Sequence, residues 1–228
     1  MQSCRCMKDG QRMKIVPNSM AKAATDMRNV LRQLADDQSS IVGEIFRHET
    51  EFVEWRHYPA GDVYDPISGI QYYYHAHNLQ PGEHGHFHTF IRPYHRTGSP
   101  TGADPGTLSH LIGIRMNELS EPTHLFTTNR WVTGETYLPA AEIRTALSAF
   151  AISPHLAYPL VNRWLAAMVL VFRAEIETLL DERDRAIGQR RKETSGRNLD
   201  IFEDRTLEIT SSCEISLAAR LNEVSAEG

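Results

Sequence analysis

The chain has 228 residues, of which 41% are hydrophobic and 23% charged, and its formal net charge is −5. This length and composition predict a single α+β domain over residues 20–228, with residues 1–19 as a disordered N-terminal segment. Nucleic acid is excluded as the main partner because phosphate contacts need a basic face, and none is evident. The longest apolar run, Trp164 to Phe172, is too short to cross a membrane and predicts a buried helix segment.

The first 60 residues or so predict helices followed by turns. Met20 to Leu34 and Ser40 to Trp55 are expected to be helical, with Ser39 or Ser40 as the N-cap of the second helix. The segment His57 to Gly69 contains Pro, Gly and Asp and predicts turn structure before the first strand.

Cysteine usage and the N-terminal composition both favour a cytoplasmic protein. The three cysteines are Cys4, Cys6 and Cys213, an odd number with two of them crowded together, which is no disulfide framework. Free thiols fit a reducing compartment. The first nineteen residues carry charges and lack an apolar run, so they do not predict a signal peptide.

The most informative feature is a cluster of histidines. Six of the eleven lie within residues 75–95, and five of these alternate with other residues: His75, His77, His84, His86 and His88. Alternation is the period of a β-strand, in which every second side chain points to the same face. We therefore predict a strand over Ile70 to His77, a hairpin loop over Asn78 to Glu83, and a second strand over Gly85 to Arg92.

The pairing of these two strands decides whether the histidines form one site. If His77 lies opposite His84, then His75 opposes His86 and Tyr73 opposes His88, so all five imidazoles share one face. A slip of one residue would send the two sets to opposite faces. We favour the convergent register because it also gathers the neighbouring aromatic side chains on the other, core-facing side.

Clustered imidazoles favour a metal site or a catalytic site. They repel one another when charged and leave polar atoms unsatisfied when buried, so a ligand has to compensate. The candidate metal ligands are His75, His77, His84, His86 and His88, and Glu83 is a candidate ligand or general base. Single histidines such as His95 and His48 are interpreted as structural.

The following segment continues the antiparallel sheet. Strands are expected over His110 to Met116 and His124 to Val132, and the loop between Pro93 and Ser109 is either a lid or a plain connection. Arg130 inside a strand would need an anionic partner, either a carboxylate of the fold, which we favour, or a ligand carboxylate or phosphate. Together with Glu83 and His86 it is a candidate catalytic residue.

The C-terminal third is mainly helical. Helices are predicted from Pro139 to Phe150, from about Pro159 to Arg190, and from Ser216 to Val224, with a late strand from Thr206 onward. The prediction is thus an antiparallel sheet of four to five strands with N-terminal helices and a long C-terminal helix packed on it.

Three sequence blocks carry a resemblance. YYYHAH, EHGHFHTF and TTNRWVTGE look like those of an uncharacterised bacterial protein family, over about Glu51 to the C-terminal EDRTLEI segment. The resemblance implies that the blocks form one unit, and it supplies no activity.

Two characterised families resemble the chain in part. HGHFHTF is similar to the histidine-triad motif of nucleotide hydrolases and transferases, which implies His86 as the nucleophile supported by His84 and His88, although Gly85 and Thr89 replace hydrophobic positions. The HxH of His75 and His77 is similar to the first cupin motif, but the glutamate of that motif arrives late.

The leading hypothesis is a metal-binding protein that acts as a metal-dependent enzyme on a small molecule. Zinc and iron are the first candidates for the metal, and copper is a further one. The alternatives are a nucleotidyl or phosphoryl hydrolase or transferase and a non-catalytic metal-binding or partner-binding subunit. A homo-oligomer is compatible with the sequence.

Overall fold

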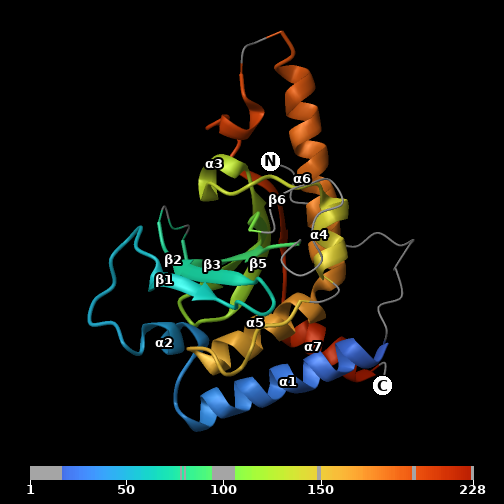
Figure 1. Cartoon of the computed structure of the whole chain (residues 1–228). Helices are drawn as coiled ribbons and strands as arrows, with labels where there is room; N and C mark the ends of the chain where they lie inside the picture. The colour runs from blue at the N-terminus through green and yellow to red at the C-terminus, as the bar shows by residue number, and fades with distance from the viewer. Residues whose placement is uncertain are drawn as a thin grey trace.

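The computed structural model of the chain describes residues 17–77, 79, 81–93, 106–147, 150–196 and 199–226. Within these residues the fold is α+β, with one six-stranded antiparallel sheet in the order β1-β2-β3-β4-β5-β6 (Figure 1). The strands are β1 Tyr58–Tyr64, β2 Gln71–His75, β3 Glu83–Ile91, β4 Ser109–Asn117, β5 Pro122–Thr128 and β6 Ile209–Glu214. The helices are α1 Pro17–Asp36, α2 Ile41–Phe46, α3 Arg130–Thr133, α4 Ala140–Leu147, α5 Pro159–Val171, α6 Arg173–Glu193, the 3-10 helix η1 Ile201–Glu203 and α7 Leu217–Ala226. The predicted fold class is confirmed, with more strands than expected.

The additional strand is β1, which replaces part of the predicted turn segment. It lies at the edge of the sheet and pairs with β2, and its register shifts between Tyr58 and Val63. Pro59 and Gly61 lie within that irregular stretch. An edge strand tolerates both residues because one of its sides needs no ladder hydrogen bonds, so turn-forming composition did not prevent a strand here.

The pairing of β2 with β3 confirms the predicted register. His75 lies opposite His86, and Tyr73 lies opposite His88. The two histidine sets therefore project from neighbouring strands toward the same side of the sheet. The residues between them point to the other side.

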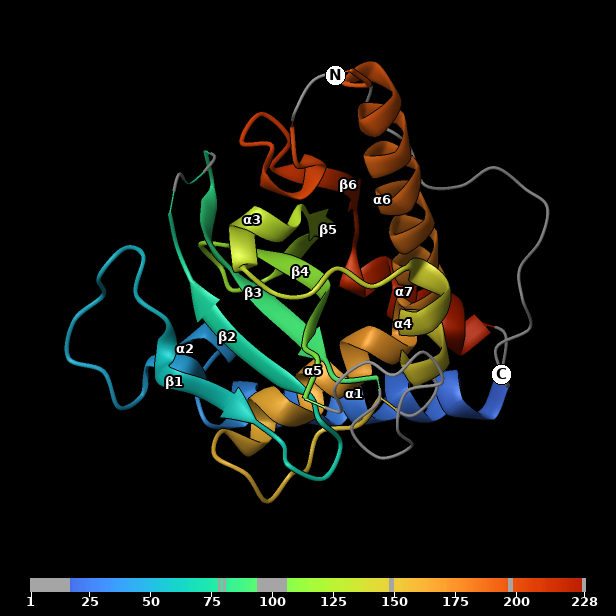
Figure 2. The ribbon, with the colours of Figure 1, turned by 45° about the horizontal axis from the view of Figure 1, so that its top comes forward.

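The opposite face of the sheet is the core face. Tyr72, Tyr74 and Phe87 are fully buried there. The ring of Phe87 lies 5.6 Å from that of Trp164 on α5, while α1 packs along α5 and α6 packs along β5 and β6 (Figure 2). The helices thus fill one side of the sheet with apolar contacts and leave the histidine side to polar groups.

Two predicted helices differ from the sequence prediction, one by ending early and the other by dividing in two. The second helix starts after its N-cap Ser40, as expected, but α2 ends at Phe46 and not near Trp55. Beyond α2 the chain makes tertiary contacts in place of helical ones: Val53 donates its N–H to the Tyr58 hydroxyl at 2.6 Å. The long C-terminal helix divides at Phe172, whose φ of −107° and ψ of 21° are not helical. This break lets α5 lie across the sheet while α6 rises along β6 (Figure 1).

Several sequence predictions fall outside the described residues. These include Cys4, Cys6, His95 and most of the loop between Pro93 and Ser109. Cys213, on β6, is buried. Among the described helices, none combines the length and the apolar composition that a membrane crossing requires. The predicted apolar run on α5 is instead part of the protein core.

Candidate metal site

Three histidines bring one ring nitrogen each to within 4.8 Å of one another: His75, His77 and His86. His75 ends β2, His77 follows two residues later, and His86 lies directly across on β3. Two nitrogens bound at about 2.0–2.1 Å to one tetrahedral zinc ion lie about 3.3 Å apart. Small side-chain rotations would therefore bring the three nitrogens to coordinating distance.

Glu83 fixes the protonation of His86. The Oε1 atom of Glu83 lies 3.1 Å from His86 Nδ1, and because a carboxylate only accepts, Nδ1 carries the proton. Nε2 of His86 then has a lone pair, which accepts a hydrogen bond from His75 Nε2 at 2.9 Å and which a metal ion could bind in place of that proton. A carboxylate behind a histidine whose other nitrogen faces a shared centre is the arrangement found around protein-bound metals.

The site keeps His75 and His77 neutral. Burial, with smaller contributions from His86, His77 and His57, holds the pKa of His75 down to about 2. Burial also lowers the pKa of His77, with His86 as the next cause. Neutral imidazole is the form that binds metal, so at pH 7 these two rings need no deprotonation before coordination.

His77 lies beyond the end of β2, and Trp55 holds it in place. The two rings stack with their centroids 4.1 Å apart and their planes at 16°, and the backbone N–H of Trp55 donates to the carbonyl of Ala76 at 3.0 Å. The Nδ1 atom of His77 is buried and has no hydrogen-bond partner among the described residues. A buried ring nitrogen without a partner is costly unless a ligand satisfies it.

His88 lies beside this group and is engaged elsewhere. Its ring centroid is 5.1 Å from those of His75 and His86, but its Nδ1 atom pairs with Nε2 of the buried His110 at 2.9 Å. Burial lowers the pKa of His88 well below its usual value and that of His110 to about 3. The structure therefore places His88 next to the three-histidine group without making it part of that group.

His84 does not join the other four histidines, which corrects the predicted convergence. The pairing of β3 with β4 shifts between Glu83 and Gly85, so β3 has one extra residue there. Such a bulge reverses the side on which the side chain lies. The Nδ1 atom of His84 lies 2.7 Å from the Tyr74 hydroxyl, and its ring contacts Phe46 and Phe52 on the core side. The predicted set of five candidate ligands is thus divided by the bulge.

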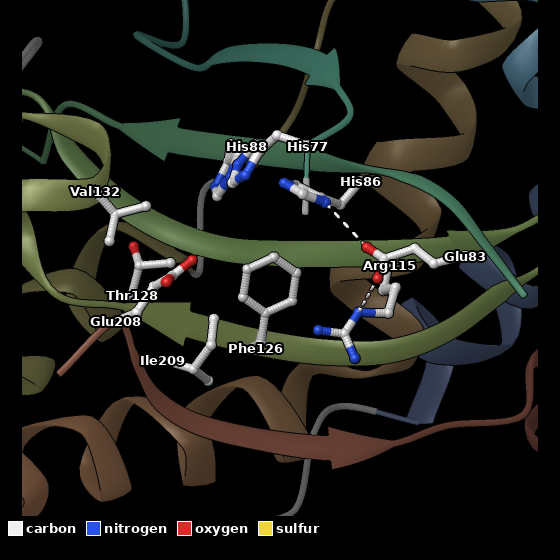
Figure 3. Close-up of a pocket in the computed structure, with 10 residues that line it drawn as sticks. All are labelled: His77, Glu83, His86, His88, Arg115, Phe126, Thr128, Val132, Glu208 and Ile209. Atoms are coloured by element: carbon white, nitrogen blue, oxygen red, sulfur yellow. Dashed lines mark hydrogen bonds and ion pairs between the residues drawn. The ribbon is translucent and has the colours of Figure 1, made fainter. Parts of the chain in front are cut away.

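A cavity of about 210 Å³ opens next to the histidines (Figure 3). It is lined by His77, Glu83, His86, His88, Arg115, Phe126, Thr128, Val132, Glu208 and Ile209. The ring of Phe126 lies in the middle, with Glu83 and Arg115 on one side and Glu208 and Thr128 on the other (Figure 3). The three-histidine group therefore borders a space that a small molecule can enter.

Arg130 lies elsewhere, and the expectation that it sits inside a strand is wrong. Strand β5 ends at Thr128, and Asn129 caps the short helix α3 by accepting a hydrogen bond from the Arg130 N–H. The guanidinium of Arg130 pairs with Asp200 at 3.0 Å and with Glu203 at 2.8 Å. Of the two partners considered from the sequence, the carboxylates of the fold are the ones it contacts.

Sequence reasoning missed Arg115 and Glu208, which line the cavity, and His110, which pairs with the cavity residue His88. Arg115 lies opposite His86 on β4, and its alternating position in the strand HLIGIRM is a signal that could have placed it on the histidine face. His110 comes from the same strand, across a register shift that no sequence pattern marks. Glu208 precedes β6, far away in the chain.

Comparison with curated proteins and with solved structures gives no match for this chain. A family model matches residues 21–215, which include the whole histidine site and all six strands. The match begins upstream of Glu51, where the segment that carries the resemblance starts. The chain therefore belongs to the family described as domain of unknown function DUF6969.

Proposed function

We propose that this protein binds one transition metal ion through His75, His77 and His86 and acts as a metal-dependent enzyme on a small molecule. The observation that carries the proposal is the convergence of three ring nitrogens within 4.8 Å beside a cavity. Three protein ligands leave one position of a tetrahedral ion open, which is the pattern of catalytic sites. A metal ion there would supply a Lewis acid and an activated water at neutral pH.

The donors favour zinc or iron, with copper as a further candidate. Imidazole suits all three ions, and none of the three proposed ligands is a thiolate or a carboxylate. Both oxygens of Glu83 are engaged, Oε1 with His86 Nδ1 and Oε2 with Arg115 Nε at 3.2 Å. This supports an orienting role for Glu83 and gives less support to its use as a ligand or general base.

The nucleotide-transfer alternative receives less support. It needs His84, His86 and His88 to act together, and the bulge in β3 directs His84 toward Tyr74 on the core side. A covalent adduct on His86 that forms from a dinucleoside polyphosphate and survives a chelator would favour this alternative over metal binding. The remaining alternative, a non-catalytic metal-binding subunit, differs from ours in showing no turnover.

The test is the metal content of protein purified without a histidine tag. We expect close to one equivalent of a transition metal after reconstitution, and we expect the double variant His75→Ala/His86→Ala to lose it. His84→Ala is the matched control, because this histidine lies two residues from His86 on the other face and should leave the metal content unchanged. Folded protein that binds no metal after reconstitution would contradict the proposal.

A further inference from the structure

The cavity beside the three histidines also indicates what it binds. Arg115 and Phe126 line it, and neither belongs to the three-histidine group. We propose that the ligand of this cavity is a small organic carboxylate, whose carboxylate group binds Arg115 and whose apolar body packs between Phe126, Val132 and Ile209. This inference rests on the proposed function, because it names the class of molecule that the metal site would act on.

The two terminal nitrogens of Arg115 are available as hydrogen-bond donors on the cavity side. Its Nε atom faces Glu83 Oε2 at 3.2 Å, and among the described residues no hydrogen bond or ion pair reaches its two terminal nitrogens. Figure 3 shows those nitrogens on the side of Phe126, directed away from Glu83. A guanidinium presents two parallel N–H donors in a fixed fork, which matches the two oxygens of a carboxylate.

The charge of the metal-loaded cavity also favours an anionic ligand. The charged groups that line the cavity are Glu83, Arg115 and Glu208, so their formal sum is −1 while the histidines are neutral. A bound divalent ion would change that sum to +1. The metal-loaded cavity should therefore bind an anion more tightly than the metal-free cavity, which keeps Arg115 as its only positive charge among the described lining residues.

The almost fully buried ring of Phe126 is part of the apolar wall of the cavity. Its ring packs directly on Gly113 of β4, where an added Cβ would meet the ring at 2.3 Å. The rings of His86 and His88 lie 5.6 and 5.7 Å away at nearly right angles. Val132 and Ile209 also line the wall. The apolar body of the ligand can therefore contact these side chains while its carboxylate binds Arg115.

The size of the cavity limits the ligand. Its volume of about 210 Å³ is below the range of about 300–1,000 Å³ that is usual for ligand pockets. A carboxylate with a small ring or a short chain fits this space. A nucleotide would extend beyond it.

The test measures benzoate binding to the zinc-loaded protein by calorimetry, after the zinc content of each sample has been measured. We expect benzoate to bind more tightly than benzamide, which lacks the charge, and more tightly than acetate, which lacks the apolar body. Arg115→Gln should weaken benzoate binding by about 10- to 100-fold, and Arg115→Lys, which keeps the charge and loses the fork, should lie between. Phenylphosphonate in parallel shows whether the site prefers a carboxylate or a phosphorus oxyanion.

The matched control is Arg144→Gln. Arg144 is an ion-paired arginine of α4 with a side-chain exposure of 30%, close to the 26% of Arg115, and its partner is Asp181. This variant should bind benzoate as the unchanged protein does. Equal benzoate affinity in Arg115→Gln at full zinc content, or equal affinity for benzamide, would overturn the carboxylate inference and leave the metal proposal standing.

The measured zinc content distinguishes a failure of metal binding from a failure of carboxylate binding. If no sample retains zinc, the proposed function fails, and the same titrations on metal-free protein then decide the inference alone. Benzoate binding that depends on Arg115 without zinc would support the carboxylate assignment, and no such binding would overturn it. Tighter binding of phenylphosphonate than of benzoate would replace the carboxylate with a phosphorus oxyanion.

Discussion

At the scale of single residues, Glu83 is the group on which the candidate metal site depends most. It is almost completely buried, with a side-chain exposure of 5%, and it contacts both His86 and Arg115. A buried carboxylate needs such partners, and they in turn fix its position. One side chain thereby sets the tautomer of a proposed ligand and the orientation of the proposed anion-binding arginine.

The change Glu83→Gln should weaken metal binding while leaving the three histidines in place. Glutamine keeps the shape of the side chain but loses the charge that polarises His86, and changes behind a ligand of this kind cost about 10- to 100-fold in metal affinity. Competition with a chromophoric chelator measures the loss. Glu121→Gln, at an exposed glutamate paired with Asn117, is the control, and equal affinities in the two variants would contradict this role.

At the scale of strands, the sequence predicted the pairing of β2 and β3 and failed at the points where the ladder is irregular. The period of two in the histidine blocks, together with the aromatic residues between them, sufficed to align His75 with His86. A bulge adds one residue without changing the composition, so the reversal of His84 had no signal apart from Gly85. At Gly85 an added Cβ would lie 2.6 Å from the Tyr74 hydroxyl and 2.7 Å from the His75 carbonyl, which explains why the close approach of the strands requires glycine there.

At the scale of helices, the sequence predicted the start of α2 but missed the break between α5 and α6 and the short helix α3. The sequence predicted Ser39 or Ser40 as the N-cap of the second helix, and Ser40 is the cap, because its side chain accepts a hydrogen bond from a backbone N–H of the first turn. The break at Phe172 could not be predicted, since neither proline nor glycine marks it and both α5 and α6 continue the apolar spacing. Arg130 was misplaced because Asn129 is compatible with the end of a strand and also caps a helix.

The contact between β4 and β5 predicts the effect of Gly113→Ala. A Cβ at Gly113 would lie 2.3 Å from Cζ of Phe126, and that ring is buried beneath His86 and His88. The ring must therefore move into the cavity, and we expect a loss of about 1–3 kcal/mol in the free energy of unfolding. Gly188→Ala on α6 is the control, because nothing lies within 4 Å of its added Cβ and alanine favours the helix. Urea unfolding compares the two, and equal midpoints would contradict the close contact.

At the scale of the whole molecule, the sheet separates two environments. The side covered by α5 and α6 holds the apolar core, while the other side holds buried histidines, an ion-paired glutamate and the cavity. Several imidazoles in a poorly solvated region make the stability of the entire fold depend on pH. Each of them is stable there as the neutral ring, so protonation competes with folding.

The metal-free protein should lose stability as the pH falls below about 6.5. Burial lowers the pKa of His75 to about 2 and that of His110 to about 3, whereas the unfolded chain has values near 6.5. Between these pKa values the unfolded state binds more protons than the folded state. Each such histidine therefore lowers the free energy of unfolding by about 1.4 kcal/mol for each unit that the pH falls. The stability that comes from its neutral form is fully present only above about pH 6.5. His110→Gln removes one titrating ring that lies outside the three-histidine group, and its slope should be smaller by about that amount. Urea unfolding at pH 7.5, 6.0 and 5.0 in the presence of a chelator measures both slopes, and identical slopes would show that His110 is not held neutral by the fold.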